Sequence, residues 1–390
     1  MGIARTSLKG VTHHVPSKTY NGYTLFTPMS GKDAWLIDMQ GRFVHRWGTE
    51  PYGPVFARLL PNGNLLYLGV KSGGLMGPGL AYLHGDEEFE QSEENRGACL
   101  VEVDWDNNLV WKYEAPQSNH DFYRMENGNT MYVKYITVPD DIKNKVKGGI
   151  PGTEQNGVMW ADALNEVTPE GKVVWEWRAY EHLDPGIDII CPLEYRGEWT
   201  HMNTCTILSD GNILGSFRQT NTICIIDKAT GNIVWRWGRE ELGHQHEPTM
   251  LDNGNILVFD NGVHRYFSQD LDYYSRVMEV NPATNKIEWE YKADPLSEFY
   301  SAIGGGAQRL PNGNTLICED VAGRLFEVTP DGEIVWEYIN PFFGPFLTFG
   351  QCNRLYRAYR YGLDYGGLKG KTLDPNNHKW INGVYGPDTS

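Results

Sequence analysis

The sequence predicts an all-β fold, and specifically a six-bladed β-propeller. Three observations lead to this expectation: a composition rich in glycine and proline, five copies of a tight-turn motif, and six copies of a strand pair in phase with those turns. The chain of 390 residues contains 44 glycines and 21 prolines, and 13% of its residues are aromatic. Many short strands joined by tight turns account for such a composition better than long helices do.

The charge of the chain narrows the classes of partner. The sequence has 34 Lys+Arg against 50 Asp+Glu, a formal net charge of −16. Such a surface repels a phosphate backbone and an anionic lipid leaflet, so we expect no nucleic-acid partner and no membrane partner. No apolar run approaches the roughly 20 residues that span a bilayer. Residues 1–10 lack the apolar stretch of a signal peptide, and we expect a cytoplasmic protein, or an exported one whose signal has been removed.

The cysteines do not form a recognisable framework. All six lie at wide, irregular spacings, and no Cys-x-x-Cys pair occurs. The sequence therefore predicts neither a zinc ribbon nor a disulfide-stabilised scaffold.

The first repeated unit is an Asn-Gly-Asn or Asp-Gly-Asn turn followed by an apolar strand. Asn-Gly and Asp-Gly suit the positive φ angles of a two-residue hairpin loop, so each copy predicts a sharp reversal between two inner strands. The five copies occupy residues 61–64, 126–129, 209–212, 252–255 and 311–314.

The second repeated unit is an outer hairpin whose last strand usually carries a tryptophan. Equivalent positions are 45, 111, 175, 235, 289 and 336, which are separated by 66, 64, 60, 54 and 47 residues. Each interval is about the length of one four-stranded blade with its loops. We therefore expect one propeller domain over residues 20–362, an N-terminal arm over residues 1–19 and a C-terminal tail over residues 363–390.

Six outer hairpins stand against five inner turns, because the first copy lacks its inner strand. We expect residues 353–358 to complete that first blade and close the ring. The repeated tryptophans predict packing between blades rather than a wall for a ligand. Three insertions, at residues 73–97, 140–160 and 180–199, exceed what blade turns need, and we expect them to shape a binding pocket.

Histidines recur at equivalent positions of the inner strands, which line the channel of a propeller. His120 lies eight residues before Gly128, and His246 lies eight residues before Gly254. Independent packing choices do not repeat a titratable side chain at one repeat position, so the register predicts a functional site.

Further polar side chains share this register. His201 and His244 each lie ten residues before the glycine of their own blade, and Asn203 takes the eight-residue position. Because strand side chains alternate with period two, we expect these residues to face the same channel. His45 and His264 lie outside the register, and no role is predicted for them.

An arginine belongs with these histidines. Arg218 follows the inner hairpin of the blade that carries His201. A guanidinium can donate two hydrogen bonds to one oxyanion, and a neutral imidazole can act as a nucleophile. Together these groups predict a site for a tetrahedral oxyanion such as sulfate or phosphate.

The motifs around these residues make a family resemblance specific. The chain resembles the bacterial arylsulfotransferases, six-bladed propellers that work without phosphoadenosine phosphosulfate, over residues 20–362. The motifs are Trp-Thr-His-Met-Asn at 199–203, Ser-Phe-Arg at 216–218, Asp-Lys-Ala-Thr-Gly-Asn at 227–232, Gln-His at 245–246, Phe-Asp-Asn-Gly at 259–262 and Tyr-Arg-Ala-Tyr-Arg-Tyr at 356–361.

The resemblance implies an activity and roles for the matching residues. It implies that His246 takes the sulfuryl group from an aryl sulfate, while His201, His120 and Arg218 hold its oxygens, and that a phenolic acceptor then receives the group. We expect Asn203 and His244 to bind substrate, a small aromatic compound as the partner, and no cofactor. The oligomeric state is not predicted. Residues 239–243 lack the cysteine pair that the family carries before its nucleophile.

Two other functions remain open at this point. Three strand imidazoles can also hold a divalent metal, so His120, His201 and His246 could be the ligands of a metal-dependent lyase, hydratase or hydrolase. In that interpretation His244 is a fourth ligand or supports the others, and Glu247 is a general base. The second possibility is an interaction propeller that displays loops, although a scaffold has no use for three histidines in register.

Overall fold

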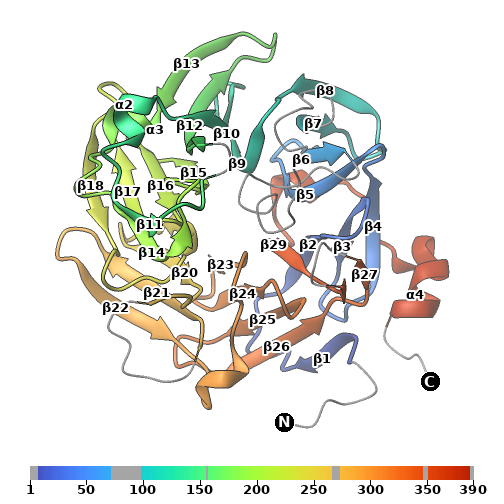
Figure 1. Cartoon of the computed structure of the whole chain (residues 1–390). Helices are drawn as coiled ribbons and strands as arrows, with labels where there is room; N and C mark the ends of the chain where they lie inside the picture. Colours follow the sequence, from blue (N-terminus) through green and yellow to red (C-terminus); the bar gives the residue numbers. More distant parts are fainter. Residues whose placement is uncertain (1–7, 72–97, 155–156, 266–272, 346–349, 387–390) are drawn as a thin grey trace. The chain divides into compact units, whose positions relative to one another are not determined.

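The computed structural model describes residues 8–71, 98–154, 157–265, 273–345 and 350–386. It confirms the predicted fold class: the chain is all-β, and its six main sheets are the blades of a six-bladed β-propeller (Figure 1). The chain divides into two compact units, one of residues 1–69, 101–110 and 303–390, the other of residues 70–100 and 111–302.

The first unit contains two complete blades. One has the strand order β29-β2-β3-β4, and the other has the order β23-β24-β25-β26 with β1 as a fifth strand on β26. The first blade consists of β29 (Leu355–Gly362), β2 (Gly22–Pro28), β3 (Asp33–Ile37) and β4 (Phe43–Gly48). The second consists of β23 (Gly306–Arg309), β24 (Thr315–Glu319), β25 (Arg324–Val328), β26 (Ile334–Ile339) and β1 (Gly10–His14).

The C-terminal strand completes the first blade, as the missing inner turn predicts. β29 pairs antiparallel with β2, from Gly22 opposite Gly362 to Pro28 opposite Leu355. The residues before and after the propeller are also ordered parts of this unit. β1 from the N-terminal arm pairs with β26, and helix α4 (Lys379–Tyr385) of the tail exchanges two hydrogen bonds with β4 through Asn382 and the backbone of Phe43.

The second unit contains three complete blades. Their strand orders are β13-β12-β10-β9, β15-β16-β17-β18 and β19-β20-β21-β22. The blades consist of β9 (Ser118–Arg124), β10 (Thr130–Thr137), β12 (Trp160–Val167) and β13 (Val173–Arg178); β15 (Met202–Ile207), β16 (Ile213–Phe217), β17 (Thr222–Ile226) and β18 (Ile233–Trp237); and β19 (His246–Met250), β20 (Ile256–Asp260), β21 (Arg276–Asn281) and β22 (Lys286–Tyr291).

The sixth blade has the order β5-β6-β7-β8. It consists of β5 (Tyr52–Leu59), β6 (Leu65–Lys71), β7 (Ala98–Val103) and β8 (Leu109–Glu114). The other described elements are short: β27 (Gly344–Pro345), β28 (Gln351–Cys352), α2 (Asp140–Lys143), α3 (Ala179–His182) and the 3₁₀ helices η3 (Leu296–Glu298), η5 (Gly366–Leu368) and η6 (Pro375–His378). Within the described residues the longest helix has seven residues, and none is able to span a lipid bilayer.

The inner turns differ in one detail from the two-residue loops expected from the sequence. In the first copy the Leu60 amide donates to the Asn64 carbonyl at 2.8 Å, and the Gly63 amide donates to the Leu60 carbonyl at 2.9 Å. Three residues therefore form the loop, and the glycine alone takes a positive φ. The asparagine before it instead accepts a hydrogen bond from the Asn64 amide through its side chain. The same glycine φ, between 82° and 89°, recurs at Gly63, Gly128, Gly211, Gly254 and Gly313.

The asparagine after each glycine explains a second repeated residue, the glutamate of the neighbouring outer strand. Asn64 Nδ2 donates to Glu102 Oε1 at 2.7 Å, and Asn314 Nδ2 donates to Glu327 Oε1 at 2.6 Å. Each blade that carries this pair thus locks its turn to its third strand through a side-chain hydrogen bond.

The outer tryptophans support the packing interpretation. Trp177 is buried and its Nε1 donates to the Gly231 carbonyl in the next blade at 2.9 Å. Trp336 likewise donates to the Met39 carbonyl at 2.9 Å. These indoles fill the space between adjacent sheets and satisfy a turn carbonyl there, which suits an aromatic ring with one polar atom.

The insertions flank the second unit's blades. Strand β11 (Gly148–Ile150) of the insertion at 140–160 pairs in parallel with β14 (Ile190–Tyr195) of the insertion at 180–199. Arg196 fastens this pair, since its guanidinium donates to the Gly148 carbonyl at 2.8 Å and the Val146 carbonyl at 2.6 Å. The third predicted insertion, residues 73–97, lies outside the described residues.

Candidate active site

The structure brings the three predicted site histidines together in the second unit. His120 lies on β9, His201 directly precedes β15 and His246 begins β19. The ring centroids of His120 and His201 are 4.4 Å apart, with the rings edge to face. Both of these imidazoles, together with Arg218, are close enough to lower the pKa of His246.

The backbone at these positions is not the regular strand that a simple alternation of side chains assumes. His120, His201 and His244 have φ angles of 46°, 53° and 61°, in the left-handed region. The pairing of β9 with β10 and of β19 with β20 shifts register beside His120 and His246. Bulges of this kind re-aim a side chain, so the period-two expectation was wrong in its geometry although it selected the right residues.

The surroundings of His246 fix its tautomer. His246 Nδ1 lies 2.7 Å from Asn261 Oδ1 and 3.1 Å from the His244 carbonyl oxygen. The Asn261 amide nitrogen donates to the Ser301 carbonyl at 2.8 Å, which leaves its oxygen to face the imidazole. Because both neighbours of Nδ1 are acceptors, Nδ1 carries the proton and Nε2 carries the lone pair.

A buried carboxyl links the strands of His120 and His201. His120 Nδ1 lies 2.8 Å from Asn119 Oδ1, and Asn119 Nδ2 donates to Asp162 Oδ1 at 3.4 Å. Asp162 Oδ2 accepts from the Thr200 hydroxyl and from the Met202 amide, both at 2.6 Å. Asp162 therefore holds the orientation of His120 and the backbone on both sides of His201.

A second buried carboxyl, Glu198, stands against His201. His201 Nδ1 lies 2.9 Å from Glu198 Oε1, and the Tyr195 hydroxyl donates to Glu198 Oε2 at 3.0 Å. Burial raises the pKa of Glu198 to about 8 and lowers the pKa of His201 to about 3. Near neutral pH the pair therefore consists of a protonated carboxyl and a neutral imidazole.

Arg218, just beyond β16, is the positive group of the site. Its Nη2 lies 3.3 Å from Glu194 Oε1, and its Nη1 donates to Gln219 Oε1 at 3.3 Å. Burial, and after it the charge of Arg218, lowers the pKa of His201 and His244. The imidazoles are consequently neutral at physiological pH, the state needed for a nucleophile or a metal ligand.

The two residues predicted to bind substrate are fully buried. Asn203 Nδ2 donates to the Gln245 carbonyl at 2.8 Å, so its amide ties β15 to the chain that leads into β19. His244 Nε2 lies 3.2 Å from His264 Nδ1. These contacts place both residues among the groups that support the site histidines.

Comparison with protein families identifies the chain. A family model of arylsulfotransferases (ASST) matches residues 97–341, more than half of the sequence. The chain belongs to the arylsulfotransferase family. The matched region contains all four residues to which the sequence resemblance assigns sulfuryl transfer.

Solved structures agree with this family member in fold. A protein of unknown function from Bacteroides caccae is 15% identical with a TM-score of 0.52, over 87% of this chain and 100% of that one. A streptogramin B lyase is 12% identical (TM-score 0.47, 90% and 93% covered), as is hydrazine synthase from Kuenenia stuttgartiensis (TM-score 0.47, 84% and 81% covered). No curated protein matches the sequence.

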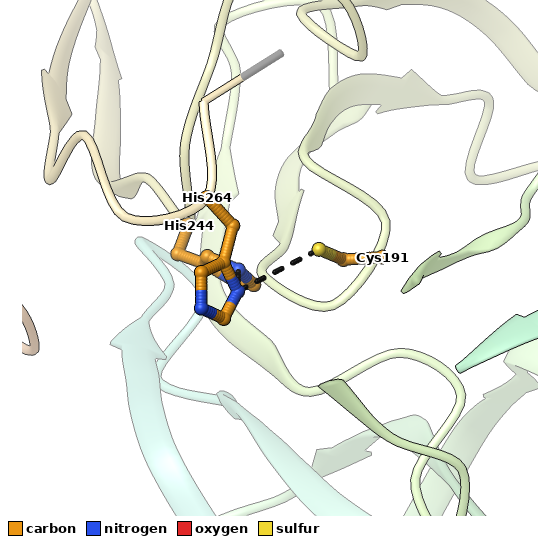
Figure 2. Close-up of side chains that lie close together, drawn as sticks. All are labelled: Cys191, His244 and His264. Carbon is orange, nitrogen blue, oxygen red and sulfur yellow. Dashed lines mark hydrogen bonds between the residues drawn. The ribbon is translucent and has the colours of Figure 1, made fainter. Parts of the chain in front are cut away.

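In this arylsulfotransferase family member the structure also assembles residues that the sequence analysis did not select. Within the described parts of the chain, one group of three potential metal ligands has all its donor atoms within 4.8 Å of one another: Cys191, His244 and His264 (Figure 2). The predicted ligand set of His120, His201 and His246 does not form such a group there.

The missed residues lacked a sequence signal. Asp162, Glu198 and Asn261 occupy no repeated position, and their roles arise from contacts across blades. Cys191 lies in the insertion at 180–199, whose length was the one feature that pointed to it. His264 follows the Asn-Gly at 261–262 and falls outside the histidine register.

Proposed function

We propose that the protein transfers a sulfuryl group from an aryl sulfate to a phenolic acceptor, with His246 as the nucleophile. The observation that carries the proposal is the tautomer of His246, whose Nδ1 faces two acceptors so that Nε2 bears the lone pair. Membership of the arylsulfotransferase family supports the class of reaction.

The first half of the reaction forms a sulfohistidine. The Nε2 lone pair of neutral His246 attacks sulfur, the bond from sulfur to the aryl oxygen breaks, and the phenolate leaves with that electron pair. The imidazole keeps its Nδ1 proton and becomes positively charged. Asn261 Oδ1, at 2.7 Å, and the His244 carbonyl, at 3.1 Å, both accept from this N–H and stabilise the developing charge.

The second half returns the enzyme to its starting state. The acceptor hydroxyl attacks the sulfohistidine, the bond from sulfur to Nε2 breaks, and the hydroxyl proton passes to a neutral imidazole, for which His201 and His120 are the candidates. His201 suits this role because Glu198 stands 2.9 Å from its Nδ1 and can stabilise the imidazolium that forms.

Arg218 has an electrostatic role in both halves. Its cation favours an anionic sulfate, and its fork of N–H donors matches two sulfate oxygens. The same charge keeps His246 neutral, because it lowers the pKa of that imidazole. Arg218→Lys retains the charge but loses the bidentate geometry, so it should weaken transfer without abolishing it.

The test traps the covalent intermediate. The protein is mixed with a nitrophenyl sulfate in the absence of an acceptor, and its intact mass and the released nitrophenolate are followed. Wild-type protein should gain one SO₃ group on His246 with a stoichiometric burst of nitrophenolate, and His246→Ala should show neither. His182→Ala, at an imidazole that stacks on Trp177 in the same unit, serves as the matched control and should behave like wild type. Wild-type transfer rates in His246→Ala would refute the proposal.

A further inference from the structure

We propose that the protein binds one divalent metal ion of the zinc class through Cys191 Sγ, His244 Nε2 and His264 Nδ1. The three side chains converge on one point, as Figure 2 shows. The proposal goes beyond sulfuryl transfer and does not depend on it, because it concerns different ligand atoms and a property measurable without substrate.

The distances between the donor atoms fit a tetrahedral ion. His244 Nε2 and His264 Nδ1 are 3.2 Å apart, and His264 Nδ1 and Cys191 Sγ are 3.7 Å apart. With metal–nitrogen bonds of about 2.0 to 2.1 Å and metal–sulfur bonds of about 2.3 Å, tetrahedral ligands are separated by roughly 3.3 to 3.6 Å. The observed separations lie within a few tenths of an ångström of these values, so little rearrangement is needed to hold the ion.

The chemistry of the cluster also favours a cation. Two donors, the Cys191 thiol and the His244 Nε2–H, point at His264 Nδ1, a nitrogen with a single lone pair. Hydrogen bonding alone makes them compete for that lone pair. A metal ion instead uses one lone pair from each of the three atoms, and thiolate with imidazole is a donor set that zinc prefers.

Glu194 balances the charge of such an ion. Its Oε1 lies 3.4 Å from His244 Nε2 and 3.7 Å from His264 Nδ1, and the same oxygen is 3.3 Å from Arg218 Nη2. A thiolate and a carboxylate together neutralise a dication, so Arg218 then adjoins a cluster of zero net charge. The repulsion that an arginine would otherwise exert on the ion is thereby offset.

The position of the cluster gives the ion a structural role. Cys191 and Glu194 lie on β14 of the insertion at 180–199, whereas His244 precedes β19 and His264 follows β20. The ion would fasten this insertion to the blade that begins with His246, and so hold Glu194 against Arg218. The ligands are separated by 53 and 20 residues in sequence, which is why no metal motif marks them.

Metal content and a spectrum test the site without reference to activity. Chelator-treated full-length protein is incubated with zinc, dialysed, and analysed for bound metal per chain; a second sample is loaded with cobalt(II). Wild type should hold about one ion, and the cobalt form should show a thiolate-to-cobalt charge-transfer band with the intense visible bands of tetrahedral coordination.

Matched variants assign the ligands. Cys191→Ser and His264→Asn should bind zinc at least about tenfold more weakly, and Cys191→Ser should lose the charge-transfer band. The controls Cys352→Ser and His182→Asn change the same residue types away from the cluster and should keep both metal and band. Circular dichroism establishes that each variant is folded.

Either of two results would overturn the proposal: wild-type protein that takes up no stoichiometric metal, or a cobalt form without the thiolate band. The second criterion uses wild type alone, so it holds even where a variant fails to fold. A wild-type protein that forms sulfohistidine without binding metal would refute the metal site and leave the proposed function standing.

Discussion

Asp162 should make the stability of the protein depend on pH. This carboxyl is fully buried in the second unit, and burial, with a further contribution from Glu198, raises its pKa to about 8. In the unfolded chain an aspartate titrates near 3.9. Between these two values folding takes up a proton, so the free energy of unfolding falls as pH rises.

The size of the effect follows from the difference in pKa. Stability from this group is complete below about pH 4 and is lost by about 1.4 kcal/mol per pH unit until the pH passes about 8. Raising the pH from about 5.5 to about 7.5 should therefore remove about 2 to 3 kcal/mol of stability. Asp162→Asn cannot ionise, yet its amide oxygen can still accept from Thr200 and Met202. The variant should show a correspondingly shallower slope.

Urea denaturation at several pH values provides the assay. The slope of unfolding free energy against pH is compared between wild type and Asp162→Asn, with Asp331→Asn as a control that removes an exposed turn carboxylate. The control should keep the wild-type slope. Equal slopes in wild type and Asp162→Asn would refute the reasoning, because they would mean that the buried carboxyl is ionised in the folded protein.

Two further predictions follow from single hydrogen bonds. Trp177→Phe should destabilise the protein by about 1 to 3 kcal/mol in urea denaturation, because it leaves the buried Gly231 carbonyl without its donor; Trp235→Phe, at a partly exposed indole, should cost less than about 1 kcal/mol, and equal losses would contradict the packing argument. Asn261→Ala should slow transfer by up to about tenfold, since it removes an acceptor worth about 1 kcal/mol from Nδ1 of His246, and an unchanged single-turnover rate would argue against a fixed tautomer.

Local chemistry made the architecture predictable. A glycine with positive φ is needed wherever the inner hairpin reverses, and the same dipeptide therefore recurs once per blade. The tryptophan at the outer strand recurs because each blade presents the same packing surface to its neighbour. The absence of the first inner turn then implied that the C-terminal strand pairs with the first blade, and β29 does pair with β2.

The candidate site was predictable only in part. The repeat places His120, His201 and His246 at the inner ends of neighbouring blades, which is a statement about register and needs no coordinates. The bulges beside His120 and His246 were not foreseen, because a register shift leaves no trace in the spacing of the repeat. The strand geometry at the site therefore had to come from the structure.

By itself, the sequence determined the fold class, the number of blades, the strand that completes the first blade and the histidines that share one register, because each of these follows from a local rule repeated along the chain. The tertiary structure alone decided which nitrogen of His246 is protonated, which carboxyls are buried against the imidazoles, and that Cys191 meets His244 and His264. Those properties arise from contacts between residues 15 to 73 positions apart, and such contacts carry no periodic signal in the sequence.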